Sequence, residues 1–249
     1  MLLTSIQQVA PFMSLASQFA PTGTLRVGVW TVPYFAHVHA GGLRGIIPDL
    51  GVELARRAGV KLDLVKFENP ARITTAFRDG SLDATFVGIT ADRAEAIDFG
   101  PVVFEIQTTY LVPAASAIAS IAEIDRAGVR IAVPAKSAQE AYLATTISAA
   151  TLLPIPAETP RRAIELLQAG GADAFSHVAP MLAAVQGGLP GSRILRGSYF
   201  NVPVGIGVAK GRPRAVADFA RIFAEDVTLS GFVQQSIDRN ALAGVRVPT

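Results

Sequence analysis

Short apolar runs alternate with amphipathic stretches along most of the chain. The run over 25–30 is rich in aliphatic and β-branched residues, which is typical of a strand, and the stretch over 49–58 repeats apolar residues four positions apart and ends at Gly59, which is typical of a helix. The same patterns predict further strands over 62–65, 83–88, 129–133, 151–155 and 173–176, helices over 71–78, 138–145, 161–169, 180–186 and 213–229, and an apolar run over 203–209. This alternation favours an α/β architecture with largely parallel strands.

The predicted elements fall into two α/β sets, and 249 residues are enough for two lobes. The natural crossing points are Val112-Pro113 and Val202-Pro203. We therefore expect a lead-in segment over 1–23, a discontinuous first lobe over 24–112 and 203–249, and a second lobe over 113–202.

Composition excludes several classes of protein. Half of the residues are hydrophobic and 17% are charged, which indicates a folded chain. Twenty-two Lys and Arg face 20 Asp and Glu, so the net charge of +2 leaves no basic excess for nucleic acid. The chain has no Cys, hence no thiolate nucleophile, no thiolate metal site and no disulfide.

The first 25 residues carry no charged side chain, but Gln and Pro interrupt them too often for a transmembrane span. The apolar stretch over 9–15, with small residues at Ser14-Leu15-Ala16, has features of a secretory signal, although no Lys or Arg precedes it. The alternative is a short lead-in helix that ends near Pro21.

The usual catalytic and metal motifs are missing from the sequence. His37 and His39 share one face of an extended segment without an apparent third metal ligand, and the glycines over 205–211 lack the spacing of a phosphate loop. His177 follows a predicted strand without a visible nucleophile, which is more typical of a hydrogen-bonded core or rim residue. We expect no metal, no cofactor and no catalytic residue.

Two segments place hydrogen-bond donors where a strand runs into a helix. Gly88 to Arg93 offers backbone amides, the Thr90 hydroxyl and a guanidinium, a set suited to a carboxylate. Lys136-Ser137-Ala138 offers a similar cradle at a predicted helix N-terminus in the other lobe. The alternative interpretation is ordinary helix capping with a surface ion pair.

With these segments in place, the sequence resembles the solute-binding proteins of family 3 that serve ABC transporters. The resemblance runs from about Thr24 to Asn240, and no single motif in it is decisive, but the order and spacing of the motifs are specific. The matching words include Leu25-Arg26-Val27-Gly28, Leu82-Asp83-Ala84, Gly88-Ile89-Thr90 with Arg93, Ala132-Val133 before Ser137, Asp173-Ala174, and Gly205-Ile206-Gly207-Val208.

The resemblance implies a two-lobe type II periplasmic-binding-protein fold, in which two crossover strands join the lobes and a hinge closes them on a small ligand, like a Venus flytrap. It further implies that Arg93 holds the α-carboxylate of the ligand, helped by Gly88 and Thr90 and by the helix start at Ser137 and Ala138.

The sequence departs from the family pattern at three places. Two residues are missing between Thr90 and Arg93, the acidic residue that holds the amine of the ligand is replaced by Val178, and an acidic position after the first strand reads Trp30. Because an apolar side chain cannot neutralise an ammonium group, we expect a carboxylate ligand without an α-amine. Trp30, with Tyr34 or Phe35, then forms an apolar wall, unless these rings are core residues, and His177 and Val178 join the expected ligand-binding set.

The expected function is therefore capture of a small anionic organic solute by a monomer that serves an ABC permease. The resemblance implies a periplasmic location, whereas the signal-poor N-terminus favours a cytoplasmic one. Two alternatives stay open: an enzyme similar to cyclohexadienyl dehydratases, with Glu105 or Glu158 as general acid, and a cytoplasmic ligand-sensing module.

Overall fold

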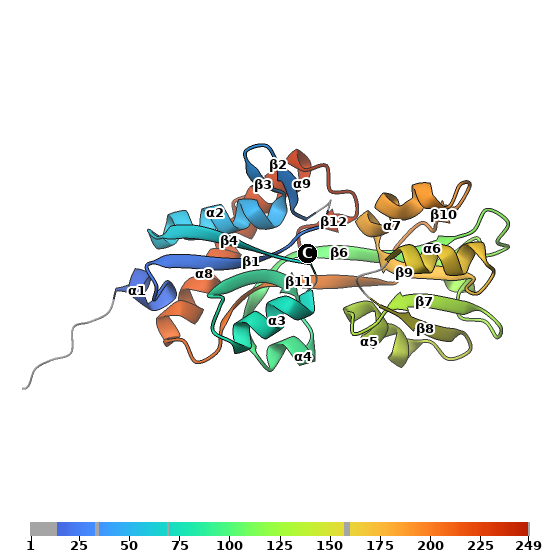
Figure 1. Cartoon of the computed structure of the whole chain (residues 1–249), viewed down its shortest axis with the longest axis horizontal. Coiled ribbons are helices and arrows are strands. Elements are labelled where there is room, and N and C mark those ends of the chain that lie inside the picture. Colours follow the sequence, from blue (N-terminus) through green and yellow to red (C-terminus); the bar gives the residue numbers. More distant parts are fainter. Residues whose placement is uncertain (1–13, 33–34, 69, 157–159, 249) are drawn as a thin grey trace, which may run out of the picture.

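A computed structural model describes residues 14–32, 35–68, 70–156 and 160–248 of the chain. The molecule is elongated, and its two lobes share one ten-stranded sheet (Figure 1). The strands are β1 (Thr24–Trp30), β2 (His37–His39), β3 (Gly42–Arg44), β4 (Lys61–Phe67), β5 (Ala84–Gly88), β6 (Ile97–Val112), β7 (Arg130–Pro134), β8 (Thr151–Ile155), β9 (Ala174–Val178), β10 (Arg193–Ile194), β11 (Phe200–Ala209) and β12 (Val245–Arg246). The α-helices are α1 (Leu15–Phe19), α2 (Ile46–Ala58), α3 (Pro70–Arg78), α4 (Ala91–Ala94), α5 (Ala138–Thr146), α6 (Pro160–Gln168), α7 (Ala179–Val185), α8 (Arg214–Leu229) and α9 (Phe232–Arg239), with short 3-10 turns at Ile121–Glu123 and Gln186–Gly188.

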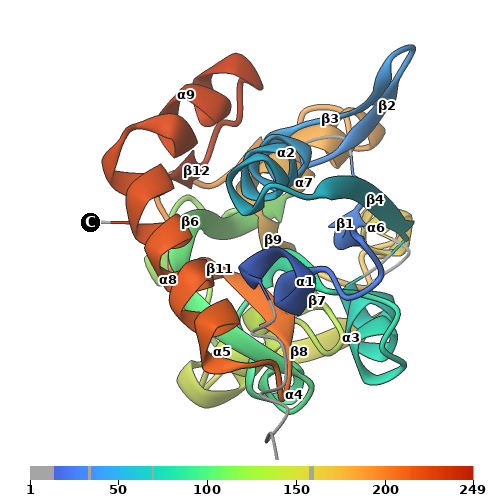
Figure 2. The ribbon, with the colours of Figure 1, turned by 90° about the vertical axis from the view of Figure 1, so that its left-hand side faces the viewer.

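The first lobe is a three-layer sandwich around strands β4, β1 and β5, which run parallel. Helices α2 and α8 cover one face and α3 and α4 the other, as the end-on view in Figure 2 shows. The apolar residues spaced four apart in the sequence pattern, such as Leu50 and Leu54, are fully buried against this sheet. Helix α2 begins three residues earlier than the pattern predicts, because Gly45 with a φ of 134° caps it and Pro48 fits its first turn.

The second lobe repeats this arrangement with the parallel strands β9, β7 and β8. Helix α5 packs on one face and α6 and α7 pack on the other, each over its own hydrophobic cluster. The α/β prediction with two sets of elements is confirmed, and most predicted elements differ from the observed ones by one to three residues.

Two long antiparallel strands, β6 and β11, join the lobes. Strand β6 pairs with β11 from Ile97 to Thr108 and with β9 from Thr108 to Leu111, so it belongs to both lobes. The register of the β6–β11 pair shifts on either side of Gly205, and β12 adds a third partner at Glu105 and Ile106. The sequence pattern did not predict β6 as a strand, and it did not foresee that the sheet is antiparallel where the lobes meet.

An arginine–aspartate pair occupies the same place in each lobe. Arg26 on the first strand binds both carboxylate oxygens of Asp83, at 2.9 and 3.0 Å, and Arg130 binds both oxygens of Asp173, at 3.0 and 3.1 Å. Each aspartate stands directly before the third parallel strand of its lobe. These bonds tie β1 to β5 in the first lobe and β7 to β9 in the second, and each pair is adjacent in the sheet.

The N-terminal part that the structure describes begins with α1, which Ser14 caps. Phe19 of this helix is buried, its ring centroid lies 5.6 Å from that of Phe219, and Arg212 donates to the carbonyl oxygen of Gln18. A lead-in helix before Pro21 is thus present, whereas most of the stretch over 9–15 lies outside the described residues.

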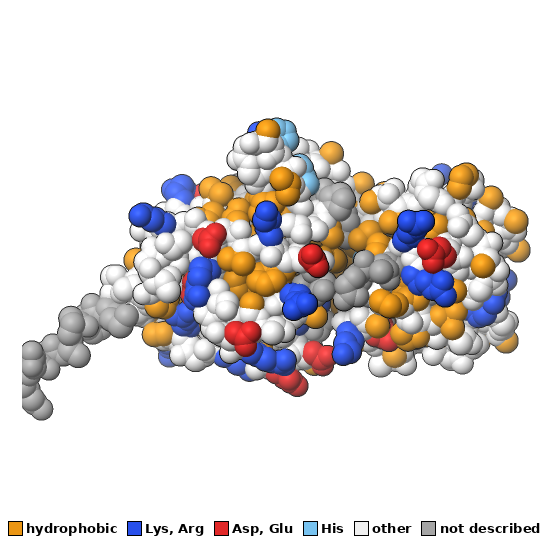
Figure 3. All heavy atoms as spheres, viewed as in Figure 1, with side chains coloured by type: hydrophobic (Ala, Val, Ile, Leu, Met, Phe, Trp, Pro, Cys, Tyr) orange, Lys and Arg blue, Asp and Glu red, His pale blue; other side chains and the backbone are white. Residues whose placement is uncertain are grey.

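The face of the molecule drawn in Figure 3 is mixed in charge. On the face drawn in Figure 3, acidic and basic side chains are interspersed over both lobes. The hairpin of β2 and β3 projects from the first lobe, with His37 and His39 exposed on it. In the described ranges, no helix is both long enough and apolar enough to cross a bilayer.

Candidate functional site

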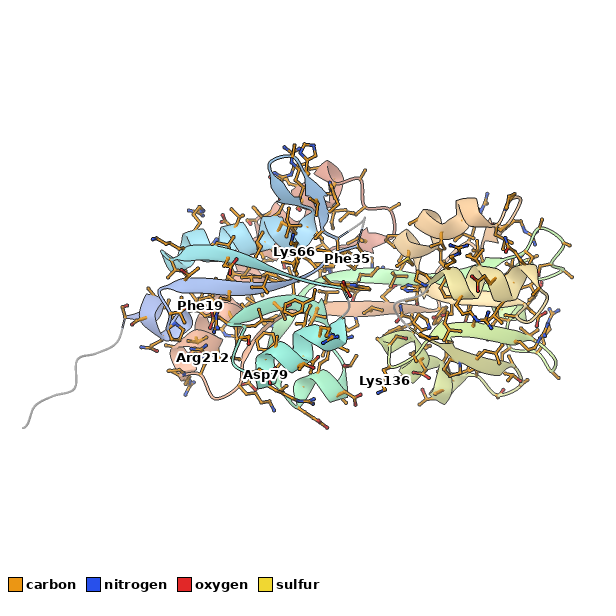
Figure 4. All side chains as sticks on the ribbon, in the orientation of Figure 1. Phe19, Phe35, Lys66, Asp79, Lys136 and Arg212 are labelled. Atoms are coloured by element: carbon orange, nitrogen blue, oxygen red, sulfur yellow. The ribbon has the colours of Figure 1, made fainter. Side chains whose placement is uncertain are left out.

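A cavity of about 330 Å³ lies at the junction of the two lobes. Figure 4 shows Phe35 at the inner end of the first lobe and Lys136 at the inner end of the second, on opposite sides of this junction. The described lining residues come from both lobes: Trp30, Phe35, Ile47, Ala71, Phe86, Val87, Gly88, Arg93, Phe104, Ile106, Pro134, Ala135, Lys136, Ser137, Ala138, Gln139, Pro156, His177, Val178, Val202 and Val204.

Arg93, on the short helix α4, supplies a cation to the cavity wall. Its Nη1 donates a 2.7 Å hydrogen bond to the carbonyl oxygen of Gly88, the last residue of β5. Burial lowers the pKa of Arg93 to about 10, while the carboxylate of Asp92 acts in the opposite direction, so the guanidinium is charged at neutral pH. Within the described residues, no carboxylate pairs with Arg93 and its Nε and Nη2 have no hydrogen-bond partner. Two donors of a charged fork are therefore free for an anion.

Gly88 and Thr90 have different parts in this arrangement. Gly88 lines the cavity, and a Cβ atom on it would lie 3.3 Å from Arg93 Nη1. Thr90 is not among the described lining residues; its hydroxyl instead caps α4 by accepting from the Arg93 backbone N–H at 3.4 Å. The Thr90 hydroxyl thus has the capping role that the sequence offered as an alternative, and the expected contact of the Thr90 backbone amide with the ligand stays a prediction.

The N-terminus of α5 forms the facing wall. The Ser137 hydroxyl accepts from the Glu140 N–H at 3.1 Å, and the Glu140 carboxylate accepts from the Lys136 N–H at 2.5 Å. This reciprocal capping fixes the turn, while the Ala138 and Gln139 amides have no intrahelical acceptor. Lys136 adopts a φ of 57°, a conformation that favours glycine, and its exposed side chain adds a second cation to the cavity rim.

His177 and Val178 end strand β9 on the second-lobe side. His177 is 5% exposed, its Nδ1 accepts the Val178 N–H at 2.8 Å, and burial lowers its pKa to about 3. The ring is therefore neutral at physiological pH. Val178 lines the cavity with an apolar side chain at the start of α7, and no side chain caps that helix.

Most of the remaining wall is apolar. The Trp30 indole packs edge-on against Phe35 with centroids 6.1 Å apart, and Phe35 lies 6.1 Å from Phe104. Trp30 also donates from Nε1 to the Glu68 carbonyl oxygen at 3.0 Å, so its ring is held in place from both ends. Trp30 is both a packing residue and a cavity residue, and Tyr34 lies outside the described residues.

Several lining residues were missed by sequence reasoning. Phe86, Phe104 and Ile47 are buried like core residues, yet they border the cavity and extend it into the first lobe. Gln139 is 5% exposed, and within the described part of the chain its side-chain amide has no hydrogen-bond partner. The sequence could have marked Gln139 as a lining residue, because it is a polar residue in the first turn of a predicted helix that follows a strand end.

The charged side chains that line the cavity are positive. Two cations line it, whereas no Asp or Glu does in the ranges that the structure describes. Those ranges also hold no group of three His, Asp or Glu side chains that could bind a metal ion. Glu105 and Glu158 were the two carboxylates considered for an enzyme. Glu105 forms a 2.7 Å ion pair with Arg246 and is not among the lining residues. Glu158 lies outside the described residues.

Comparison with solved structures finds the same fold in amino-acid-binding proteins. The solute receptor for L-cysteine of Neisseria gonorrhoeae is 20% identical with a TM-score of 0.72, over 93% of this chain and 95% of the receptor. The ancestral amino acid-binding protein AncCDT-1, a precursor of cyclohexadienyl dehydratase, is 22% identical with a TM-score of 0.71, over 91% and 99% of the two chains. A mutant of ArgBP from T. maritima is 21% identical with a TM-score of 0.69, over 90% and 98%.

At these identities the structures establish the fold, which is the two-lobe fold of type II periplasmic binding proteins. No curated protein matches the chain significantly. The model of the bacterial extracellular solute-binding proteins, family 3, matches residues 25–236, and it describes binding proteins, in keeping with a chain that is not an enzyme. The expected resemblance is thus confirmed, and the chain belongs to family 3 of the bacterial extracellular solute-binding proteins.

Proposed function

We propose that the chain is the substrate-binding component of an ABC-type transport system and that it binds a small organic acid in the cavity between its lobes. The observation that carries this proposal is Arg93, a charged and partly buried guanidinium with two donors left free among the described residues. A buried cation without a counter-ion is unfavourable, and a ligand carboxylate supplies that counter-ion in a bidentate geometry. Ser137, Ala138 and Lys136 offer further donors from the facing lobe.

The apolar character of the wall supports an acid without an α-amine. Val178 offers no charge, and the described lining contains no acidic side chain for an ammonium group. Burying an ammonium group unpaired is costly by several kcal/mol. Trp30, Phe35 and Phe104 instead favour an aromatic or branched aliphatic body on the ligand.

Family membership supports the location and the partner. The family is described as extracellular, and solute-binding proteins of ABC transporters deliver their ligand to a permease. We extend this to the present chain: it acts outside the cytoplasmic membrane, as a monomer, and docks on a permease when its lobes have closed on the acid.

A thermal-shift screen tests the binding role. Small carboxylates with and without α-amines are added to the wild type, to Arg93→Ala and to Arg214→Ala, which removes an exposed arginine on α8 of the same lobe. At about 100 times Kd, a ligand adds roughly 2.7 kcal/mol, a shift of about 5 to 11 °C for a protein of this size. We expect such shifts with amine-free acids in the wild type and in Arg214→Ala but not in Arg93→Ala. Shifts that persist in Arg93→Ala, or no shift with any acid, would contradict the proposal.

A further inference from the structure

We propose that His177 recognises a second, uncharged acceptor oxygen on the ligand, so that the protein selects oxo acids over the amino acids of the same carbon skeleton. This inference rests on the proposed function and deepens it. His177 lines the same cavity as Arg93, from the opposite lobe, and is almost completely buried.

The backbone determines which nitrogen of His177 carries the proton. The Val178 N–H donates to Nδ1 at 2.8 Å, so Nδ1 must present its lone pair. In a neutral imidazole the other nitrogen then carries the hydrogen, and His177 is an Nε2–H tautomer. The opposite tautomer would set two N–H groups against each other within hydrogen-bond distance.

His177 borders the cavity, and Nε2–H is the remaining hydrogen-bonding group of its ring. No described residue hydrogen-bonds to Nε2, and this nitrogen is not sealed from the surface either. The ring cannot easily turn away, because it packs edge-on against Phe175 with centroids 5.5 Å apart and because β9 pairs with β6 at Thr109. His177 is therefore a fixed donor that waits for an acceptor.

A fixed donor distinguishes ligand groups that accept a hydrogen bond from groups that can only donate one. A ketone oxygen accepts from Nε2–H, whereas an ammonium group offers only donors to the same nitrogen. The Gln139 amide, which lines the same cavity, can rotate to give or accept a hydrogen bond, so it does not discriminate. Of the buried polar side chains in the described wall, His177 is the one that can act towards a ligand only as a hydrogen-bond donor.

Matched acids test this selection by calorimetric titration. Phenylpyruvate, phenylalanine and hydrocinnamate form one series, ketoleucine, leucine and isocaproate a second, and levulinate with valerate a third, in which the ketone lies further from the carboxylate. In at least one series we expect the oxo acid to bind roughly tenfold more tightly than the parent acid. In the first two series the amino acid should bind on the order of 100-fold more weakly than the oxo acid.

Two variants assign the effect to His177. His177→Phe should abolish the preference for the oxo acid over the parent acid, and His177→Gln, which returns a side-chain N–H, should restore part of that preference. Acids that bind with no oxo preference, or a preference that survives His177→Phe, would overturn this inference and leave the proposed function standing. If no acid binds at all, the proposed function falls and this inference falls with it.

A ligand-free measurement checks the tautomer independently. Long-range proton–nitrogen correlation NMR distinguishes a pyridine-like from a pyrrole-like ring nitrogen in ¹⁵N-labelled protein. We expect a pyridine-like Nδ1 for His177, whose signals are assigned as those that remain when the exposed hairpin residues His37 and His39 are both replaced by Gln. A pyrrole-like Nδ1 would overturn the inference even where the His177 variants fold poorly.

Discussion

Arg93 Nη1 donates a 2.7 Å hydrogen bond to the carbonyl oxygen of Gly88, and this bond links the one cavity-lining guanidinium that the structure describes to the end of β5. The link depends on the absence of a side chain at Gly88, since an added Cβ would lie 3.3 Å from Nη1 and 3.0 Å from Val202 Cγ1. The orientation of the free donors of Arg93 is thus set by two residues five positions apart.

Gly88→Ala is therefore expected to weaken acid binding by displacing Arg93. We expect an affinity roughly tenfold lower, because a shift of a few tenths of an ångström misaligns a bidentate charge-assisted pair. Gly41→Ala, on the hairpin where a Cβ meets nothing within 4 Å, is the matched control. Calorimetric titration decides the matter: equal affinities for both variants would show that Gly88 does not position Arg93.

Lys136→Gly separates binding from stability. The φ of 57° strains a lysine backbone by about 1 kcal/mol, and glycine relieves this strain. Glycine also has a larger conformational entropy in the unfolded chain, and this destabilises the folded state by a similar amount. We expect chemical denaturation to give an unfolding free energy within about 1 kcal/mol of wild type. Acid binding should fall by about threefold to tenfold at low salt and less at high salt, because a rim cation is lost. A large loss of stability with unchanged affinity would contradict this account.

His177 makes the free energy of unfolding depend on pH at values above those at which carboxylates titrate. Its pKa falls from 6.5 to about 3 on folding, so the unfolded chain binds the proton first as the pH drops. Stability is present above pH 6.5 and is lost as the pH falls towards 3, by up to about 1.4 kcal/mol per pH unit. Urea unfolding of the wild type at about pH 7 and about pH 5 should show this loss, and His177→Gln should reduce it. Identical pH slopes for the two proteins would refute the assignment.

The two arginine–aspartate pairs should differ in their effect on stability. The Asp83 side chain is fully buried between Arg26 and Arg212, whereas the Asp173 side chain is 34% exposed. Removing the carboxylate from the buried site leaves two partners uncompensated, so Asp83→Ala should lower the unfolding free energy by about 3 kcal/mol. Asp173→Ala should lower it by about 1 kcal/mol. Urea unfolding curves measure both values, and a larger loss at Asp173 would reverse the argument.

The sequence predicted the elements of each lobe well because their patterns are local. Helix α2 presents apolar residues at the helical period, and strand β5 is a short run bounded by turn residues that is buried on both faces. Strand β6 escaped prediction because Gly100 and Pro101 interrupt it and because its partners, β11 and β9, lie far away in sequence. Long-range pairing leaves no short-range pattern.

The candidate site was foreseen in part. Arg93, Gly88, Ser137, Ala138, Trp30, His177 and Val178 all line one cavity, although they come from segments up to 148 residues apart, and their roles in ligand binding stay predictions. Phe86 and Phe104 were not foreseen, because periodicity shows that a residue is buried but not whether it borders a cavity. The Thr90 hydroxyl caps α4, because the residue between a strand and a helix is where the helix needs its cap, and the expected contact of the Thr90 backbone amide stays a prediction.

The most direct test of the central claim is a crystal structure of the protein with an acid selected by the thermal-shift screen. We expect the ligand in the cavity between the lobes, with its carboxylate oxygens within about 3 Å of Arg93 Nε and Nη2, the donors that Gly88 leaves free. An acid bound elsewhere, or bound in the cavity with its carboxylate directed away from Arg93, would contradict the account.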